Sequence, residues 1–327
     1  MHASHLFCVA PMMEWTDRHD RYFLRLISRH ARLYTEMIAT QALLRGERAK
    51  LLRFDPAEQP VALQLGGCIA GDLARCAEFG EREGYAEINL NCGCPSDKVQ
   101  DGGFGACLMR EPRRVAAGIA AMRAATRLPV TVKCRIGVDD SEEYPFLKHF
   151  VETVAAAGCD TFIVHARKAW LKGLSPKENR EIPPLTYETV YRLKRDLPQL
   201  TVVINGGIRT LEECDRHLKH VDGVMMGREV YENPWILADV DRRWFGGAAP
   251  GDRASVLRRF VPYAARERAA GTPLAQMTRH LLGLYRGQHG GRAFRRLLTE
   301  QACRPGTGLD IFEQALAAVE TQLQAVA

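Results

Sequence analysis

Four polar or ionisable side chains end apolar runs of the sequence, where a parallel sheet would gather its chemistry. Gln64, Lys133, His165 and Asn205 each stand at the end of a separate run. In barrels of parallel strands, reactive groups collect at the carboxyl ends of the strands. Two amides, an ammonium and an imidazole in one mouth could hydrogen-bond a planar heterocycle. We therefore predict that these residues line a binding site.

Lys133 ends an otherwise apolar run, and a buried ammonium needs an anionic or electron-rich partner. It could form a Schiff base, as in aldolase-type barrels, or contact the electron-rich edge of a reduced flavin ring. It could also pair with Glu36 or another carboxylate of the barrel mouth. Pro11 and Met12 could cover the face of a flavin ring, so the flavin interpretation accounts for more of the residues.

Glycine-rich segments follow the last two apolar runs. Gly206 and Gly207 lie in INGGI, and Gly227 precedes Arg228 in MMGR. The loops after strands seven and eight of a barrel often bind phosphate, because glycine lets backbone amides approach an oxyanion while a cation neutralises it. A tight turn alone would explain the first pair but not the arginine. These segments predict a phosphorylated ligand or cofactor.

A long glycine-rich loop, NCGCPSDKVQDGGFGACLM, follows the fourth run and places Cys94 directly before Pro95. Long loops at this end of a barrel are usually functional. Cys92 and Cys94 have no second pair of thiols nearby, so we expect no metal site. A covalent nucleophile usually needs a neighbouring base, whereas a thiol is a workable general acid at neutral pH. Cys94 is therefore the candidate acid.

Eight short apolar runs must position these groups. Stretches with helical spacing, such as residues 70–83 and 112–126, separate most of them. Their continuous hydrophobicity indicates strands buried on both faces, as in a parallel sheet. Eight such units in about 240 residues predict an α/β fold, a closed (β/α)8 TIM barrel over residues 1–245. An open doubly wound sheet would also fit, but no GxGxxG follows the first run. The runs are HLFCVAPM, RLYTEMI, PVALQLGG, YAEINLNCG, PVTVKCRIG, CDTFIVHA, LTVVINGG and HVDGVMMGR.

The chain changes character after Trp244. FGGAAPGD is typical of a linker, and the residues that follow have helical spacing without strand-like runs. We predict a small all-helical domain over residues 246–327. Two of its helix faces would be marked by Val256, Leu257, Phe260 and Val261, and by Leu281, Leu282 and Tyr285.

The basic charge of the chain is concentrated in this carboxyl-terminal region. Residues 251–300 hold ten arginines against Asp252, Glu267 and Glu300, a balance of +7, whereas the whole chain of 327 residues has a net charge of +6. The rest of the chain is thus close to neutral. A polyanionic partner is therefore predicted for the helical domain.

Composition narrows the class of protein further. A 46% hydrophobic chain of 327 residues can bury one large core and still supply a smaller domain. No run approaches the ~20 apolar residues of a membrane-spanning helix, and the amino terminus does not resemble a secretory signal. Ten cysteines without paired spacing favour a reducing compartment. We expect a cytoplasmic protein that binds no membrane and has no obligate protein partner.

Eight motifs of the sequence occur together in one family of enzymes. They are APMMEWTDRHDR, TEMI, VALQLGG, NLNCGCPSDKVQDGGFGACLM, KCRIG, HARKAWLKGLSPKENREIPPL, NGGI and MMGRE. Together they resemble the tRNA-dihydrouridine synthases, specifically the A type. The segments GCPSDKVQ and AWLKGLSPKENREIPPL are the most specific, whereas NGG followed by GR recurs in other flavin barrels. Departures are mild: Cys92 replaces an expected aliphatic residue, Lys98 a common arginine and Glu14 a common aspartate.

The resemblance implies an FMN enzyme, reduced by NADPH, that converts a uridine of the tRNA D-loop, with positions 20 and 20a as the family expectation, to 5,6-dihydrouridine. Hydride would pass from the flavin to one carbon of the uracil double bond, and a proton from Cys94 to its neighbour on the opposite face. Implied FMN contacts are Pro11, Met12, Met13, Gln64, Lys133, His165, Asn205, Gly206, Gly207, Gly227 and Arg228. Implied tRNA contacts are Asn91, Lys177, Arg180, Arg292, Arg295 and Arg296.

Three other functions stay open at this point. A flavin barrel that reduces a free pyrimidine would share the phosphate loops but gives no reason for a basic helical domain. A Schiff-base aldolase would use Lys133 and be colourless. A tRNA-binding protein without catalysis is disfavoured, because all candidate catalytic and FMN residues are present. The sequence assigns no role to Cys107, Glu36 or Arg135.

Overall fold

The computed structural model describes the backbone of residues 5–324 and the side chains of residues 5–321. By contact the chain divides into two compact units. The first comprises the chain up to Met13 together with Arg32–Gly227, and the second comprises Glu14–Ala31 together with the chain from Arg228 onward. The functional division between residues 245 and 246 stays a prediction.

The first unit is a barrel of parallel strands in the order β1-β9-β8-β7-β6-β5-β4-β2, with β3 paired to β4. The ring closes between β1 and β2, because Val9 N donates to Arg32 O at 2.9 Å and Arg32 N donates to Phe7 O at 3.0 Å. The predicted (β/α)8 barrel is confirmed. The strands are β1 Phe7–Val9, β2 Leu33–Tyr34, β3 Ile38–Ala39, β4 Val61–Gly66, β5 Glu87–Cys92, β6 Val130–Arg135, β7 Thr161–His165, β8 Thr201–Asn205 and β9 Gly223–Met226.

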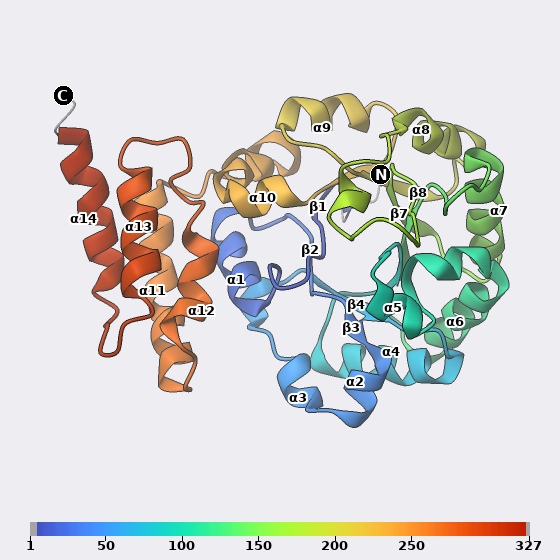
Figure 1. Cartoon of the computed structure of the whole chain (residues 1–327), viewed down its shortest axis with the longest axis horizontal. Helices are drawn as coiled ribbons and strands as arrows, with labels where there is room; N and C mark the ends of the chain where they lie inside the picture. The colour runs from blue at the N-terminus through green and yellow to red at the C-terminus, as the bar shows by residue number, and fades with distance from the viewer. Residues whose placement is uncertain (1–4, 325–327) are drawn as a thin grey trace. The chain divides into compact units, whose positions relative to one another are not determined.

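Helices surround these strands (Figure 1). The spacing predicted α4 at its observed bounds, Ala70–Glu83, and α6 within one residue, at Pro112–Ala125. Gly84 ends α4 in the left-handed region, with φ at +89°. The other helices of this unit are α2 Thr40–Arg45, α3 Arg48–Leu51, α5 Asp97–Asp101, α7 Glu143–Ala156, α8 Tyr187–Asp196 and α9 Leu211–Leu218.

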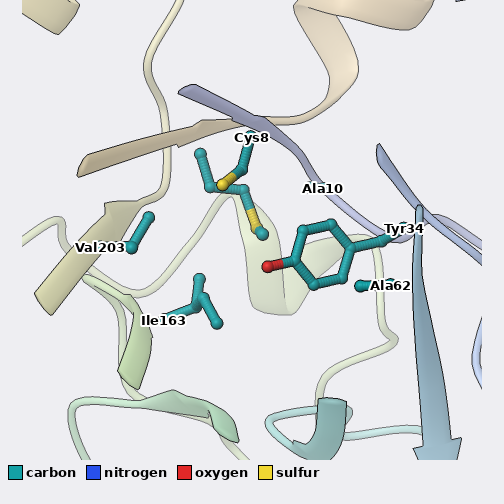
Figure 2. Packing of buried hydrophobic residues seen from close by; sticks show 7 residues of the cluster. Cys8, Ala10, Tyr34, Ala62, Ile163 and Val203 are labelled. Atoms are coloured by element: carbon teal, nitrogen blue, oxygen red, sulfur yellow. The ribbon is translucent and has the colours of Figure 1, made fainter. Parts of the chain in front are cut away.

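The barrel interior contains an apolar cluster beneath a polar mouth. Ala62, Ile163 and Val203 belong to a fully buried cluster at its centre, completed by Cys8, Ala10, Tyr34 and Met225 (Figure 2). Side chains two positions apart on a strand face the same way. Gln64, His165 and Asn205 therefore follow these core residues into the mouth of the barrel. One strand periodicity thus fixes both the core and the candidate site.

The second unit is helical, and residues 246–252 have no regular structure, as the predicted linker requires. Val256, Leu257 and Phe260 are buried on one helix, as predicted. The predicted helix through Leu282 and Tyr285 is wrong: turns occupy this stretch up to Gly290, and Gly287 and Gly290 adopt positive φ. The helices are α1 Arg18–Ile27, α10 Arg228–Glu232, α11 Arg253–Ala269, α12 Leu274–Thr278, α13 Gly291–Gln301 and α14 Ile311–Gln324.

Within residues 5–324, no helix is both long enough and apolar enough to cross a membrane.

Replacing Ile163 with alanine should lower the free energy of unfolding by about 2–5 kcal/mol, because it leaves a cavity at the centre of the barrel. Urea unfolding checks this. Ile69→Ala is the matched control, since Ile69 is 55% exposed and its loss should change the unfolding free energy by under about 0.5 kcal/mol. Equal effects of the two substitutions would contradict the assigned barrel core.

Candidate active site

Lys133 is a half-buried cation that lacks a carboxylate partner among the described residues. Its Nζ donates to Asn205 Oδ1 at 3.2 Å, and Asn205 Nδ2 donates in turn to Met225 O at 2.7 Å. Burial, and after it the charge of Arg135, lowers the pKa of Lys133 to about 8. The alternative expectation, an ion pair between Lys133 and Glu36, is not present in the structure. The ammonium can therefore bind an anionic or electron-rich ligand.

His165 lies beside Lys133 in the mouth as a neutral ring. It is paired in register with Arg135 on β6 and Asn205 on β8. Burial, followed by the charges of Arg135 and Lys133, lowers its pKa well below the usual value. A neutral imidazole offers one hydrogen-bond donor and one acceptor, which suits a polar heterocycle.

The loop after β8 has the geometry of an oxyanion cradle. Gly206 and Gly207 have φ of +120° and +70°, and an added Cβ would lie 2.6 Å from the His165 ring or 2.5 Å from Leu185. Both positions therefore require glycine. Within the described part of the chain, the backbone N–H groups of the two glycines make no hydrogen bond. They are available to a phosphate.

The start of α9, by contrast, is already satisfied from within the protein. The Glu213 carboxylate accepts hydrogen bonds from Arg209 N at 2.6 Å and Thr210 N at 3.1 Å. Thr210 and Glu213 form a capping box that closes this helix end. The free amides of the loop are thus those of the glycine pair, and not those of the helix terminus.

The other predicted phosphate residues are less constrained. A Cβ on Gly227 would meet Ala10 at 3.5 Å, an ordinary contact, so space alone does not require glycine there. Arg228 begins α10 and belongs to the second unit.

The residues predicted to cover the flavin ring follow β1. Pro11 and Met12 are half-buried, and Met13 is 57% exposed. Their contacts with a cofactor stay predictions.

Cys94 is positioned through the backbone of its loop. Asn91 Oδ1 accepts hydrogen bonds from Gly93 N and Cys94 N, both at 3.0 Å, and Cys94 O accepts one from Ala106 N at 2.8 Å. Gly105 makes this fold possible, because it has φ at +82° and a Cβ there would lie 2.6 Å from Cys94 O. The Cys94 side chain is half-buried, as a proton donor to a bound substrate must be.

Cys92, the other thiol of the motif, is fully buried. Desolvation raises its pKa well above the ordinary value. Such a thiol stays protonated and chemically inert. The structure therefore separates the two cysteines that flank Gly93 and leaves Cys94 as the accessible one.

Arg135 organises the site in a way that the sequence did not reveal. Its Nε donates to Gly93 O at 3.2 Å, and its Nη1 donates to Lys168 O at 3.1 Å and Asn179 O at 2.9 Å. Burial lowers its pKa to about 9, so the guanidinium is charged at neutral pH. The only hint in the sequence was its place two residues after Lys133.

Gln100 makes a second link between the same two loops. Its Nε2 donates to Pro95 O and to Leu171 O, both at 2.9 Å. The segment that contains Cys94 is thereby joined to the segment that contains Lys177 and Arg180. Lys177 is exposed, and the charge of Arg180 is among the causes that lower the pKa of Lys133, so Arg180 acts on the barrel mouth.

The predicted tRNA arginines of the second unit lie together on one face of α13. Arg292, Arg295 and Arg296 are exposed, whereas Phe294 and Leu298 are buried on the opposite face of that helix. Among the described residues these three arginines have no ion-pair partner.

No cluster of three or more potential metal ligands occurs in the described residues.

Comparisons with known proteins match this chain over almost its whole length. A sequence model of the dihydrouridine synthases (Dus) matches residues 8–320. A tRNA-dihydrouridine(20/20a) synthase of Vibrio cholerae serotype O1 is 55% identical over 316 residues, 96% of each chain. Proteins of the same name from Xanthomonas axonopodis pv. citri and Escherichia coli (strain K12) are each 55% identical over 98% and 97% of this chain and 96% and 92% of their own.

Replacing Lys133 with methionine should stabilise the protein stripped of bound small molecules. At pH 7 we expect the free energy of unfolding to rise by about 1–3 kcal/mol, because a desolvated charge is removed. The folded-state pKa of about 8 lies below the ordinary 10.5. The penalty on the wild type is thus complete below pH 8 and disappears as the pH rises toward 10.5.

Urea unfolding at pH 7 and at pH 10 measures this difference. The advantage of Lys133→Met should narrow at the higher pH, while exposed Lys172→Met serves as a control with little effect at either pH. A variant that is less stable than the wild type at pH 7 would contradict the described environment of Lys133.

Proposed function

Because this chain belongs to the dihydrouridine synthase family, we propose that it reduces a uridine of tRNA to 5,6-dihydrouridine. The observation that carries the proposal is 55% identity, over nearly full length, to synthases named for positions 20 and 20a. The chain is therefore an oxidoreductase. Its substrate is proposed to be the D-loop at these two positions.

The residues of the barrel mouth fit FMN as the cofactor. Lys133 offers an unpaired cation, and Gly206 and Gly207 offer free backbone amides and a shape that only glycine allows. FMN, when bound, supplies the hydride that adds to one carbon of the uracil double bond, and NADPH is the proposed reductant. The proposed contacts remain Pro11, Met12, Met13, Gln64, Lys133, His165, Asn205, Gly206, Gly207, Gly227 and Arg228.

Cys94 is proposed to hold a proton on Sγ and to deliver it to the neighbouring carbon, on the opposite face of the uracil. The geometry of its loop supports this role, because Asn91, Gln100 and Arg135 all hold that loop through hydrogen bonds to its backbone. A general acid must be placed before the substrate arrives. The three contacts supply that placement without using the thiol itself.

The tRNA is proposed to bind through cations of both units. The target base must leave its stack to reach the mouth, and the surrounding backbone must then be held. Lys177 and Arg180 would act beside the barrel mouth, and the arginines of α13 would supply affinity by counterion release. Asn91 retains one amide hydrogen for the substrate, since its oxygen holds the Cys94 loop.

We propose that the enzyme works in the cytoplasm without an obligate protein partner. All ten cysteines are unpaired, which is the state that a reducing compartment favours. A reductase of free pyrimidines would need no exposed arginine face on α13. Family membership gives no support to a Schiff-base aldolase.

A Cys94→Ala variant should keep its yellow colour and its reduction by NADPH, yet form dihydrouridine in tRNA at least about 100-fold more slowly, because the general acid is lost. Cys92→Ala is the matched control and should stay within about threefold of the wild type, since Cys92 is buried. Mass spectrometry of the tRNA nucleosides measures both. Full turnover by Cys94→Ala would remove Cys94 from the reaction.

Replacing Arg292, Arg295 and Arg296 together with glutamine should weaken tRNA binding and reduce the slope of log Kd against log salt by about 2–3, roughly 0.7–0.9 for each lost phosphate contact. The control is a triple variant with the same charge change at Arg82, Arg123 and Arg127. These lie at the ends of α4 and α6 and just beyond α6, on the side of the barrel away from the strand carboxyl ends. Equal slopes for both triple variants would refute a tRNA role for α13.

A further inference from the structure

A continuous chain of hydrogen bonds crosses the barrel interior from the Cys94 loop to a buried carboxylate. Asn91 Nδ2 donates to Gln64 Oε1 at 2.9 Å, and Gln64 Nε2 donates to Asn89 Oδ1 at 2.8 Å. Asn89 Nδ2 then donates to Thr131 Oγ1 at 2.7 Å, and Thr131 Oγ1 donates to Glu87 Oε1 at 2.6 Å. All five side chains are buried, and they come from β4, β5 and β6.

Glu87 is the last member of this series of hydrogen bonds. It is the first residue of β5 and therefore lies at the end of the barrel opposite the mouth. Its carboxylate accepts hydrogen bonds from His5 Nε2 at 2.6 Å and from the Tyr34 hydroxyl at 3.1 Å, and Arg32 Nη1 lies 3.1 Å away. Figure 2 shows the Tyr34 hydroxyl pointing into the interior. Burial opposes ionisation, but His5, Arg32 and Thr131 outweigh it and lower the pKa of Glu87. The group is therefore a carboxylate at neutral pH.

A carboxylate can only accept hydrogen bonds, and this fixes the direction of every link above it. Thr131 must donate to Glu87, so its oxygen accepts from the nitrogen of Asn89. The oxygen of Asn89 then faces the nitrogen of Gln64, and the oxygen of Gln64 faces the nitrogen of Asn91. The oxygen of Asn91 is left to accept from the backbone of Gly93 and Cys94.

The reverse orientation would break the loop that carries Cys94. An Asn91 turned by 180° about its amide would present N–H groups to the N–H groups of Gly93 and Cys94, and two hydrogen bonds would be replaced by donor–donor repulsion. The backbone N–H groups of Gly93 and Cys94 can only donate, so they fix the Asn91 amide from the loop end of the relay. Glu87 can only accept, so it demands the same orientation from the other end.

We propose that Glu87 is a positioning residue for the reaction: through Thr131, Asn89 and Gln64 it restrains the amide of Asn91 from the barrel interior and thereby stabilises the placement of Cys94. The link to catalysis rests on the proposed function, whereas the hydrogen-bond relay itself does not. Glu87 touches neither substrate nor cofactor in this account. It acts only on how the acid loop is held.

Thr131 is the position at which to test the relay. A substitution of Glu87 would also leave Arg32 and His5 without their carboxylate in the interior, and the protein could fail to fold for that reason alone. Thr131→Val breaks the relay without touching those pairs and keeps the shape of the side chain. Thr131→Ser restores the hydroxyl, and Thr131→Ala provides a second way to remove it.

Two measurements on the flavin-loaded protein decide the matter. In Thr131→Val, hydrogen exchange of the Gly93 and Cys94 amides should accelerate about tenfold, since their acceptor loses its restraint on the Glu87 side. Single-turnover formation of dihydrouridine in tRNA should fall by about the same factor. Thr131→Ser should recover both to within about twofold. Thr161→Val is the matched control and should change neither, because its hydroxyl bonds only to the neighbouring Asp160.

The proposal is overturned if the Gly93 and Cys94 amides exchange alike in Thr131→Val and Thr131→Ser. A slower reaction in Thr131→Val without faster exchange would overturn it as well, because the effect would not pass through Asn91. If the wild type forms no dihydrouridine, the proposed function fails. The exchange measurement, which needs no tRNA, still judges the relay by itself.

Discussion

A half-buried ammonium without an anionic partner among the described residues is the constraint on which this site depends. Lys133 Nζ donates a hydrogen bond to the amide oxygen of Asn205, and Arg135 and Arg180 add to the positive charge of the mouth. Such a charge lowers the stability of the folded chain, and proteins retain destabilising residues where function requires them. The charge is explained if the proposed flavin binds there, and the backbone amides of Gly206 and Gly207 are proposed to bind the phosphate of the same ligand.

The proposed acid, Cys94, is held differently from the residues proposed to bind the cofactor. Cys94 is fixed by the backbone on both sides of it, through the oxygen of Asn91, the close approach of Gly105 and the guanidinium of Arg135. Because Arg135 and Gln100 also hold residues 168–179, the acid loop and the loop proposed to meet the tRNA are joined into one framework. Under the proposed function, contact with the tRNA and placement of the proton donor would be mechanically linked.

The sequence was sufficient for features that depend on local periodicity. Continuous apolar runs predicted the strands, and the two-residue repeat that buries Ile163 also places His165 in the mouth. The sequence was not sufficient for features that depend on strand register. Only the pairing of β5 with β6 brings Asn89 beside Thr131, so neither the relay to Glu87 nor the role of Arg135 could be predicted. The false helix at Leu282 arose because apolar spacing outweighed the breaking effect of Gly283 and Gly287.

Long-range contacts also assign to the second unit a segment that local sequence patterns do not connect with it. The segment Glu14–Ala31 belongs by contact to this unit, although the 196 residues 32–227 separate it from the rest of the unit. Asp241 illustrates the reason: its buried carboxylate accepts hydrogen bonds from Ser28 Oγ at 2.5 Å and Arg29 N at 2.6 Å. No local pattern in the sequence predicts contacts between residues so far apart in the chain.

Titration of the flavin-free protein with FMN, followed by flavin absorbance and fluorescence, tests the central claim most directly. The account predicts that the wild type binds one FMN per chain and that Lys133→Met binds it roughly 10- to 100-fold more weakly, as expected for a lost hydrogen bond to a charged group. Absence of FMN binding by the wild type, or equal affinity of the two proteins, would contradict the assignment of the Lys133 charge to a flavin.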